Sequence, residues 1–138
     1  GPPIIIGGRG PKRTPRLAAK YASEFNVPFA SVDDFSNACH VVREACHAAG
    51  RDPQSLVYSA ALVVAVGRDE AEFQRRAAAI GRQPDELRAN GACGTVAEAA
   101  ATIRKFRDAG AQRMYLQVLD LSDLDHLDLI AREVSPAV

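Results

Sequence analysis

Short apolar runs alternate with amphipathic stretches along the whole chain. Four short segments in which apolar residues predominate or alternate with polar ones, at 4–6, 24–27, 56–66 and 113–119, predict β-strands. The run at 56–66 is too continuously apolar to alternate, which is typical of a strand buried on both faces of a parallel sheet. Between these runs, apolar residues recur at helical spacing and predict helices that pack one side against the strands.

The predicted helices begin at residues that commonly cap helix N-termini. Thr14 precedes Pro15 and is expected to be an N-cap, because proline at the first helical position loses no hydrogen bond. Ser31 is the predicted cap of the next helix, and Thr95 with Glu98 forms a full capping box. Each of these signals places the start of a helix soon after a predicted strand or turn.

Apolar stripes predict which side of each helix faces the core. The last helix is expected to turn Leu124, Leu127, Ile130 and Val134 inward. The segment 81–94 contains three of the chain's glycines and a proline, and it is predicted to be irregular with about one turn of helix. The stripe predicted for the helix after Ser31 consists of Phe35, Ala38, Cys39, Val42, Cys46 and Ala49.

The order of elements predicts an α/β fold of four βα units with parallel strands, which is half of a (β/α)8 TIM barrel. A small open doubly wound sheet is the alternative architecture. The chain of 138 residues is long enough for one domain, and we interpret residues 1–138 as a single one. No internal repeat is evident beyond the βα alternation.

Charge and cysteine usage narrow the classes of function. Lysine plus arginine equals aspartate plus glutamate, 17 against 17, which disfavours a nucleic-acid-binding protein. No apolar run reaches the roughly 20 residues that span a bilayer, and no signal peptide is expected. Three cysteines at scattered positions describe no disulfide framework, so we expect a reducing, cytoplasmic setting.

The most informative motif is the turn after the first predicted strand, from Gly7 to Thr14. Its glycines allow the backbone to approach a ligand closely, and the following helix offers free N–H groups and a positive dipole end. Arg9, Lys12 and Arg13 add three cations. These are the groups that bind a phosphate. The alternative is a tight strand-to-helix turn with solvated cations, since neither a Walker A nor a G-x-G-x-x-G spacing is present.

The stretch IIIGGRGPKRTPRLAAKYASEFN resembles the luciferase-like monooxygenases, which are flavin- or deazaflavin-dependent oxidoreductases. That family shows an apolar strand, G-G-x-G, a basic stretch with threonine, and then a helix. Ser23 stands where aspartate is commoner in the family. The segment GTVAEAAATIRKFRDAGAQRMYLQVL resembles the family's closing unit. The resemblance covers essentially the whole chain and implies the C-terminal half of a TIM barrel with the flavin at its mouth.

The resemblance also implies a role for individual residues. Asn26 would lie at the end of the next strand, near the barrel mouth. FMN would support monooxygenation and the deazaflavin coenzyme F420 would support hydride transfer, with a small-molecule substrate in the intact enzyme. The residues implied to hold the phosphate of the cofactor are Gly7, Gly8, Arg9, Gly10, Lys12, Arg13 and Thr14.

Two other groups of residues could be interpreted as metal sites. For both groups we favour a structural role. Cys39 and Cys46 fall on the apolar stripe, whereas the adjacent His40 and His47 point elsewhere, so the four side chains do not converge. Aspartates at 120, 123, 125 and 128 cluster near a strand end. Their charges would stabilise the N-terminus of the following helix, which we expect Ser122 to cap. Cys93 lies in a glycine-rich loop without an adjacent base, and we assign no catalytic residue and no metal ligand.

These observations leave three hypotheses for function. The first is the cofactor-phosphate half of a luciferase-like oxidoreductase, with the chain alone expected to be inactive. The second is a non-catalytic or self-associating half-barrel, because two unpaired edge strands and an open inner face favour association. The third is a complete phosphate- or nucleotide-binding α/β module.

Overall fold

A computed structural model of the protein describes all residues from Gly1 to Val138. The chain forms two compact units, of which unit 1 comprises Gly1–Ala61 and Phe106–Tyr115 and unit 2 comprises Leu62–Lys105 and Leu116–Val138. The prediction of a single domain concerns independent folding, and it stays a prediction.

The elements are β1 (Ile5–Gly7), α1 (Arg13–Tyr21), β2 (Glu24–Pro28), α2 (Val32–Ala48), η1 (Pro53–Ser55), β3 (Val57–Gly67), α3 (Glu70–Ala79), α4 (Pro84–Asn90), β4 (Ala92–Thr95), α5 (Val96–Asp108), β5 (Arg113–Gln117), α6 (Leu124–Leu129), η2 (Ile130–Val134) and η3 (Ser135–Ala137).

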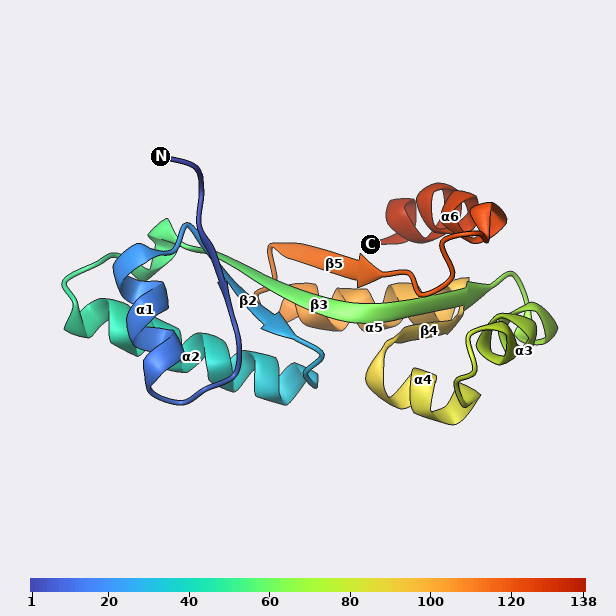
Figure 1. The fold of residues 1–138 in the computed structure, drawn as a ribbon, viewed down its shortest axis with the longest axis horizontal. Coiled ribbons are helices and arrows are strands. Elements are labelled where there is room, and N and C mark those ends of the chain that lie inside the picture. The colour runs from blue at the N-terminus through green and yellow to red at the C-terminus, as the bar shows by residue number, and fades with distance from the viewer. The chain divides into compact units, whose positions relative to one another are not determined.

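Unit 1 contains three parallel strands in the order β1, β2, β3. Gly7 lies opposite Asn26, and Asn26 lies opposite Ser59, so these three residues share one face of the sheet. The other face is covered by α1 and α2, which lie side by side (Figure 1). Phe25 and Phe35 are fully buried there. The strands of this unit are therefore supported on one face by a packed apolar layer between the sheet and the helices α1 and α2.

The stripe predicted for α2 is confirmed in its centre but not at its end, because Ala38 is only half-buried and Ala49 is exposed at the C-cap. Cys39, Val42 and Cys46 are fully buried, and the ring of Phe35 meets that of Phe106 edge to face at 5.7 Å. Ser31 caps the helix as predicted, because its hydroxyl accepts a hydrogen bond of 3.1 Å from the backbone N–H of Asp34.

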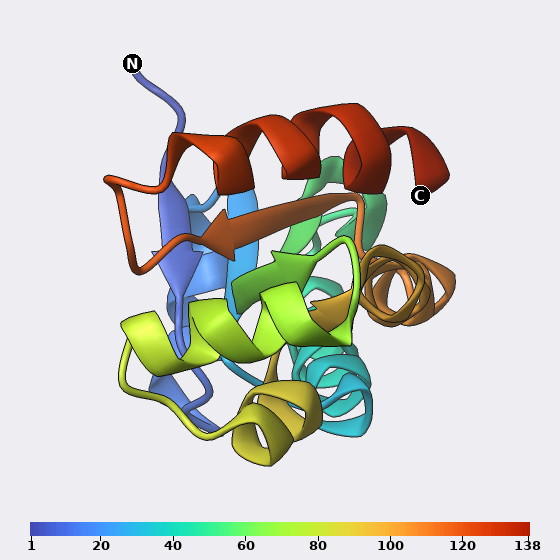
Figure 2. The ribbon, with the colours of Figure 1, turned by 90° about the vertical axis from the view of Figure 1, so that its right-hand side faces the viewer.

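Unit 2 is built around the second half of β3, which pairs in parallel with β4 from Val64 opposite Ala92 to Gly67 opposite Thr95. Figure 2 faces this unit and shows α3 next to α4. The prediction of an irregular segment at 81–94 is wrong, because α4 and β4 lie there. β4 consists of small residues whose strand conformation comes from pairing with β3 and not from their own propensity.

Two further expectations about helices are wrong. The first helix begins at Arg13, with Lys12 and not Thr14 at its N-cap position. In α6, Leu124 and Leu127 are exposed, whereas His126 and Leu129 are buried. Of the other two residues predicted to face inward, Val134 is buried and Ile130 is half-buried. The buried side of α6 is set by a hydrogen bond of His126 to β3, a polar contact that apolar periodicity does not reveal.

The α/β fold with parallel strands is confirmed. The helix initiated by Thr95 has the predicted capping box, in which Glu98 Oε2 accepts from the Thr95 N–H at 2.7 Å. None of the helices combines the length and apolar character needed to cross a membrane.

Candidate functional site

The candidate site is the turn between β1 and α1, here called the glycine turn (residues 7–14). Gly8 adopts a φ of +141°, a conformation that residues with a side chain rarely adopt. Its N–H donates a 3.2 Å hydrogen bond to the backbone oxygen of Asn26. The turn is thereby held against the adjacent strand β2.

Thr14 lies against the glycines of the turn. A Cβ atom on Gly8 would lie 3.4 Å from the Thr14 hydroxyl oxygen, and one on Gly10 would lie 3.2 Å from it. Side chains at these positions would therefore crowd the hydroxyl and fill the hollow of the turn. The structure brings together Gly8, Gly10 and Thr14 as the sequence predicted, although Thr14 is in the first turn of α1 and is not its cap.

The beginning of α1 is left free for an acceptor. Lys12 at the N-cap position makes no side-chain capping hydrogen bond, and the first turn contains no acidic residue. Uncapped N–H groups at a helix N-terminus, with the positive end of the helix dipole, favour a phosphate. The hollow kept open by the glycines and these free donors has the chemistry of an anion site.

Three cationic side chains border the glycine turn, and none of them is held in a strong ion pair. Lys12 and Arg13 are exposed and form no ion pair, whereas the Arg9 guanidinium lies 3.8 Å from the Asp34 carboxylate. Both side chains of that pair are more than half exposed, so the pair contributes little to stability. All three cations are therefore free, or easily freed, to meet an anion.

Asn26 connects the glycine turn to the sheet. Its side-chain amide Nδ2 donates a 2.9 Å hydrogen bond to the Ser59 hydroxyl, and its Oδ1 lies 4.0 Å from the position of a Cβ on Gly7. The side chain is thus oriented by β3 and lies next to the start of the turn. Asn26 lies in the middle of β2, opposite the last residue of β1, and not at the end of its own strand as expected. Its role in binding stays a prediction.

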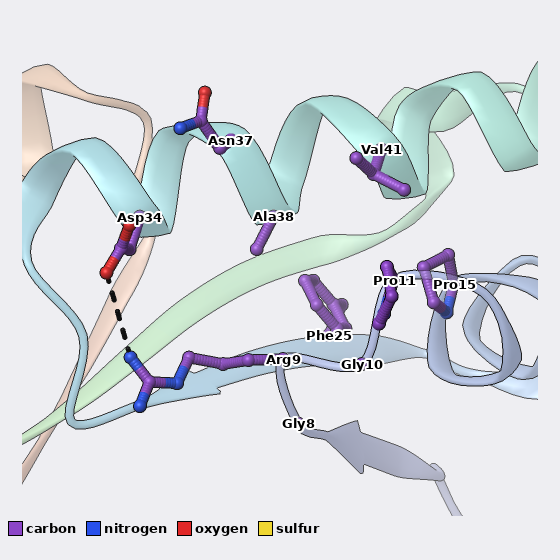
Figure 3. A pocket seen from close by; sticks show the side chains of 10 residues that line it. All are labelled: Gly8, Arg9, Gly10, Pro11, Pro15, Phe25, Asp34, Asn37, Ala38 and Val41. Atoms are coloured by element: carbon purple, nitrogen blue, oxygen red, sulfur yellow. Dashed lines mark ion pairs between the residues drawn. The ribbon is translucent and has the colours of Figure 1, made fainter.

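A cavity of about 340 Å³ opens beside the glycine turn, on the side where the helices lie (Figure 3). Its far wall comes from one side of α2 and was not predicted from the sequence. The spacing of Asp34, Ala38 and Val41 could have indicated that wall, but only the packing of α2 beside α1 places it there. The residues that line the cavity are Gly8, Arg9, Gly10, Pro11, Pro15, Phe25, Asp34, Asn37, Ala38 and Val41.

The other candidate residues have structural positions. Cys39, Cys46 and Cys93 are buried, and burial raises the pKa of the Cys39 and Cys93 thiols to about 11. His40 and His47 are exposed on α2. No group of three or more potential ligands is gathered in a geometry suited to a metal ion.

Two aspartates near the chain's end have structural roles, one as a helix N-cap and one in ion pairs with arginines. Asp123, and not Ser122, is the N-cap of α6, since its carboxylate accepts from the His126 N–H at 3.0 Å. Asp125 forms ion pairs with Arg68 and Arg76. Hydrogen bonds from these two guanidinium groups hold the pKa of Asp125 well below its usual range.

Comparison with known proteins gives one family. A family model described as luciferase-like monooxygenase matches residues 1–125. Among curated protein sequences, none matches the chain significantly.

Many solved structures have the same fold. An F420-dependent secondary alcohol dehydrogenase in complex with an F420–acetone adduct is 20% identical, covers 100% of this chain and 49% of its own, and superimposes with a TM-score of 0.78. Coenzyme F420-dependent tetrahydromethanopterin reductase from Methanopyrus kandleri is 16% identical, with coverage of 97% and 50% and a TM-score of 0.74.

A third similar structure contains FMN. The oxygenating constituent of 3,6-diketocamphane monooxygenase from Pseudomonas putida, in complex with FMN, is 20% identical, with coverage of 100% and 49% and a TM-score of 0.70. The chain thus spans about half the length of these enzymes, which are TIM barrels. The predicted half-barrel fold is confirmed.

Proposed function

The chain belongs to the luciferase-like monooxygenase family, and on that premise we propose that it supplies the phosphate-binding half of a cofactor site. The cofactor in the intact enzyme is FMN or coenzyme F420, as in similar structures. The observation that carries the proposal is the glycine turn, where Gly8 and Gly10 keep a hollow open in front of Thr14 and the uncapped start of α1.

Different groups of the glycine turn would contact the phosphate in different ways. Backbone N–H groups of the glycine turn and of the first turn of α1 would donate to the phosphate oxygens. Lys12 and Arg13 would neutralise its charge, and Arg9 would join them after leaving Asp34. When bound, the cofactor's ring supplies the redox chemistry, and the protein orients it.

No residue of this chain is assigned as a general acid or base. The whole enzyme's substrate is a small molecule whose pocket would be built largely by polypeptide outside this half. The chain alone is therefore proposed to bind the cofactor's phosphate without turning over a substrate. Three free and buried cysteines support a reducing, cytoplasmic setting.

Titration with FMN and with F420, followed by calorimetry, tests this proposal. We expect saturable binding that is lost when Gly8→Asp and Lys12→Glu are combined. Because Gly8→Asp also strains the backbone, the double substitution Lys12→Glu with Arg13→Glu provides a second variant that should fold normally, checked by circular dichroism. Arg75→Glu on α3 combined with Lys105→Glu on α5 is the matched control, since the pair makes the same total charge change at exposed sites without ion pairs.

Binding of neither cofactor would contradict the proposal and favour a fold module without a ligand. Binding of inorganic phosphate and free nucleotides in preference to both cofactors would instead favour a complete phosphate-binding module.

We further propose that the chain associates with itself through the open strand face of unit 1. Ile5 on β1 is about half exposed, and Tyr115 on β5 is 39% exposed. Exposed apolar and aromatic side chains beside strand edges favour pairing with another polypeptide. A second copy would cover this face.

A further inference from the structure

A second cavity, of about 660 Å³, opens in unit 1 at the amino-terminal end of β3. The glycine turn, by contrast, follows the carboxyl-terminal end of β1. The two cavities have no lining residue in common, since α2 contributes residues 34–41 to the first and Arg43 and His47 to the second. The second cavity is therefore separate from the proposed cofactor site. Its lining residues are Arg43, His47, Asp52, Pro53, Gln54, Leu56, Tyr58, Gly110 and Gln112.

Arg43 brings a permanent positive charge to this cavity, and no carboxylate of the chain pairs with it. Its guanidinium lies 4.5 Å from the centre of the Tyr58 ring. The ring is buried and held in place, because its hydroxyl donates a 2.9 Å hydrogen bond to the backbone oxygen of Pro53. A guanidinium stacked on an aromatic ring keeps its edge N–H groups, two of which a carboxylate can accept side by side.

Gln112 adds a donor whose orientation is fixed. Its Oε1 accepts a 2.9 Å hydrogen bond from the backbone N–H of Tyr58, and its backbone N–H donates to the Tyr58 backbone oxygen at 2.8 Å. Because the amide oxygen is occupied, Nε2 is the group that this side chain can offer to a ligand. The imidazole of His47, one helical turn after Arg43, adds a further polar group to the lining.

Asp52 brings the opposite charge to the cavity. It is the N-cap of η1, where its Oδ1 accepts a 2.9 Å hydrogen bond from the backbone N–H of Gln54. Neither an arginine nor a lysine forms an ion pair with it. The lining therefore holds one guanidinium and one carboxylate that do not neutralise each other. Such a lining attracts a ligand with one charge of each sign and disfavours a polyanion.

We propose that this cavity binds a small zwitterion of the amino-acid class, with its carboxylate on the edge of the Arg43 guanidinium and its ammonium group at Asp52. Pro53 and Leu56 provide apolar lining for the ligand's side chain. The cavity volume falls within the range of about 300–1,000 Å³ that is typical of small-molecule sites. Binding here is independent of the cofactor and of the glycine turn.

An NMR titration of the isotope-labelled chain with three probes of similar shape tests the proposal. The probes are L-leucine, isocaproate, which lacks the ammonium group, and isopentylamine, which lacks the carboxylate. We expect L-leucine to bind with a Kd of about 1 mM and each analogue to bind about tenfold more weakly. The backbone signals that shift should be those of His47, Gly110 and Gln112, which line the cavity.

Two substitutions should have reciprocal effects on these affinities. Arg43→Gln should bring L-leucine down to the affinity of isopentylamine, because the carboxylate loses its partner. Asp52→Asn keeps an oxygen that can cap η1, and it should bring L-leucine down to the affinity of isocaproate. Arg43→Lys is a second variant that retains the charge, and it should weaken L-leucine by about fivefold through loss of the paired N–H groups.

The matched control is Arg75→Gln, which removes the same charge from an exposed position on α3 and should leave all affinities unchanged. Equal affinity for the three probes, or no shift of the cavity signals up to about 50 mM, would overturn the proposal. Arg43 and His47 would then only stabilise the C-terminal end of α2 through its dipole. Equal weakening by Arg75→Gln would also overturn it, because the effect would then arise from overall charge. The cofactor titrations test the glycine turn separately, so the two proposals can fail independently.

Discussion

The imidazole Nε2 of His126 accepts a 2.9 Å hydrogen bond from the backbone N–H of Val66, near the end of β3. His126 is 5% exposed, and its own backbone N–H donates to Asp123. The bond requires the neutral ring, because a protonated imidazole has no acceptor. It attaches α6 to β3 and explains why α6 buries a histidine in place of the predicted leucines.

This bond predicts that the protein loses stability in mild acid. Burial, followed by the nearby Arg76 guanidinium, lowers the pKa of His126 below 6.5 in the folded state. The unfolded chain then binds the proton more readily, so the stabilisation is complete above about pH 6.5 and is lost as pH falls through the folded pKa. Urea unfolding between pH 8 and pH 5 measures this dependence.

His126→Gln is the control for the pH effect. Its amide oxygen can accept from Val66 and does not titrate, so the free energy of unfolding should vary less between pH 7 and pH 5. The carboxylate of Glu70, whose pKa hydrogen bonds from Arg88 lower to about 2, would contribute only at more acid pH. An equally steep dependence in His126→Gln would contradict the assignment.

Gly67→Ala should destabilise the protein strongly. A Cβ at Gly67 would collide with the backbone N of Phe73 and would lie 2.6 Å from the backbone oxygen of Asp69. Backbone atoms cannot move aside as a flexible side chain can, so we expect a loss of about 2–3 kcal/mol in the free energy of unfolding, measured with urea. Gly81→Ala is the control, because a Cβ there meets open space.

The control should cost only about 1 kcal/mol, which reflects the φ of +69° at Gly81. Similar losses in the two variants would mean that the junction of β3 and α3 can shift to admit a methyl group.

Arg113→Ala should destabilise unit 1 through the carboxylate it leaves behind. Arg113 Nη1 donates to Glu24 Oε2 at 2.5 Å, Glu24 is 4% exposed, and its Oε1 has no hydrogen-bond partner. Loss of the arginine would leave both oxygens of a buried group unpaired, at a cost of about 1–3 kcal/mol. Thermal and urea unfolding measure the effect.

A double-mutant cycle with Glu24→Gln separates the charge from the packing of the side chains. The double variant should recover part of the lost stability, because a neutral amide is less costly to bury. An Arg113→Ala loss of the same size in both backgrounds would show that the ion pair contributes nothing.

The three cysteines should be unreactive in the folded protein. Burial raises the pKa of Cys39 and Cys93 to about 11 and that of Cys46 above 9.0, so little thiolate forms at pH 8. With Ellman's reagent we expect negligible reaction until denaturant is added, and then three thiols per chain. A rapid reaction of one thiol in the native protein would contradict this prediction.

Self-association should depend on the strand face of unit 1. Sedimentation velocity over a concentration series should show a dimer that Ile5→Ser and Tyr115→Ser weaken, since both remove exposed apolar surface. Leu121→Ser is the control, because Leu121 is 75% exposed and belongs to unit 2. A monomer at every concentration, or equal weakening by the control, would disprove the proposed surface.

Local signals in the sequence predicted most elements correctly. Ser31, Thr95 and Glu98 form the capping hydrogen bonds expected of them, because a cap involves residues only three positions apart. The stripe containing Cys39 and Cys46 is buried for the same reason, since helical spacing alone puts its members on one side.

Elements that depend on distant partners were missed. β4 is a strand because Ala92 and Cys93 pair with Val64 and Ala65, and nothing in its own small residues indicates this. The orientation of α6 follows from the bond between His126 and Val66, which lie 60 residues apart.

The candidate site likewise has one part that the local sequence predicts and one part that depends on tertiary packing. The sequence by itself determined the glycine turn, because glycines, cations and a following helix are adjacent in the chain and imply phosphate binding by their chemistry. Only the tertiary structure placed α2 beside that turn, paired Arg9 with Asp34 and created the cavity between them. These depend on how two helices pack over the sheet, which is a property of side-chain shapes far apart in sequence.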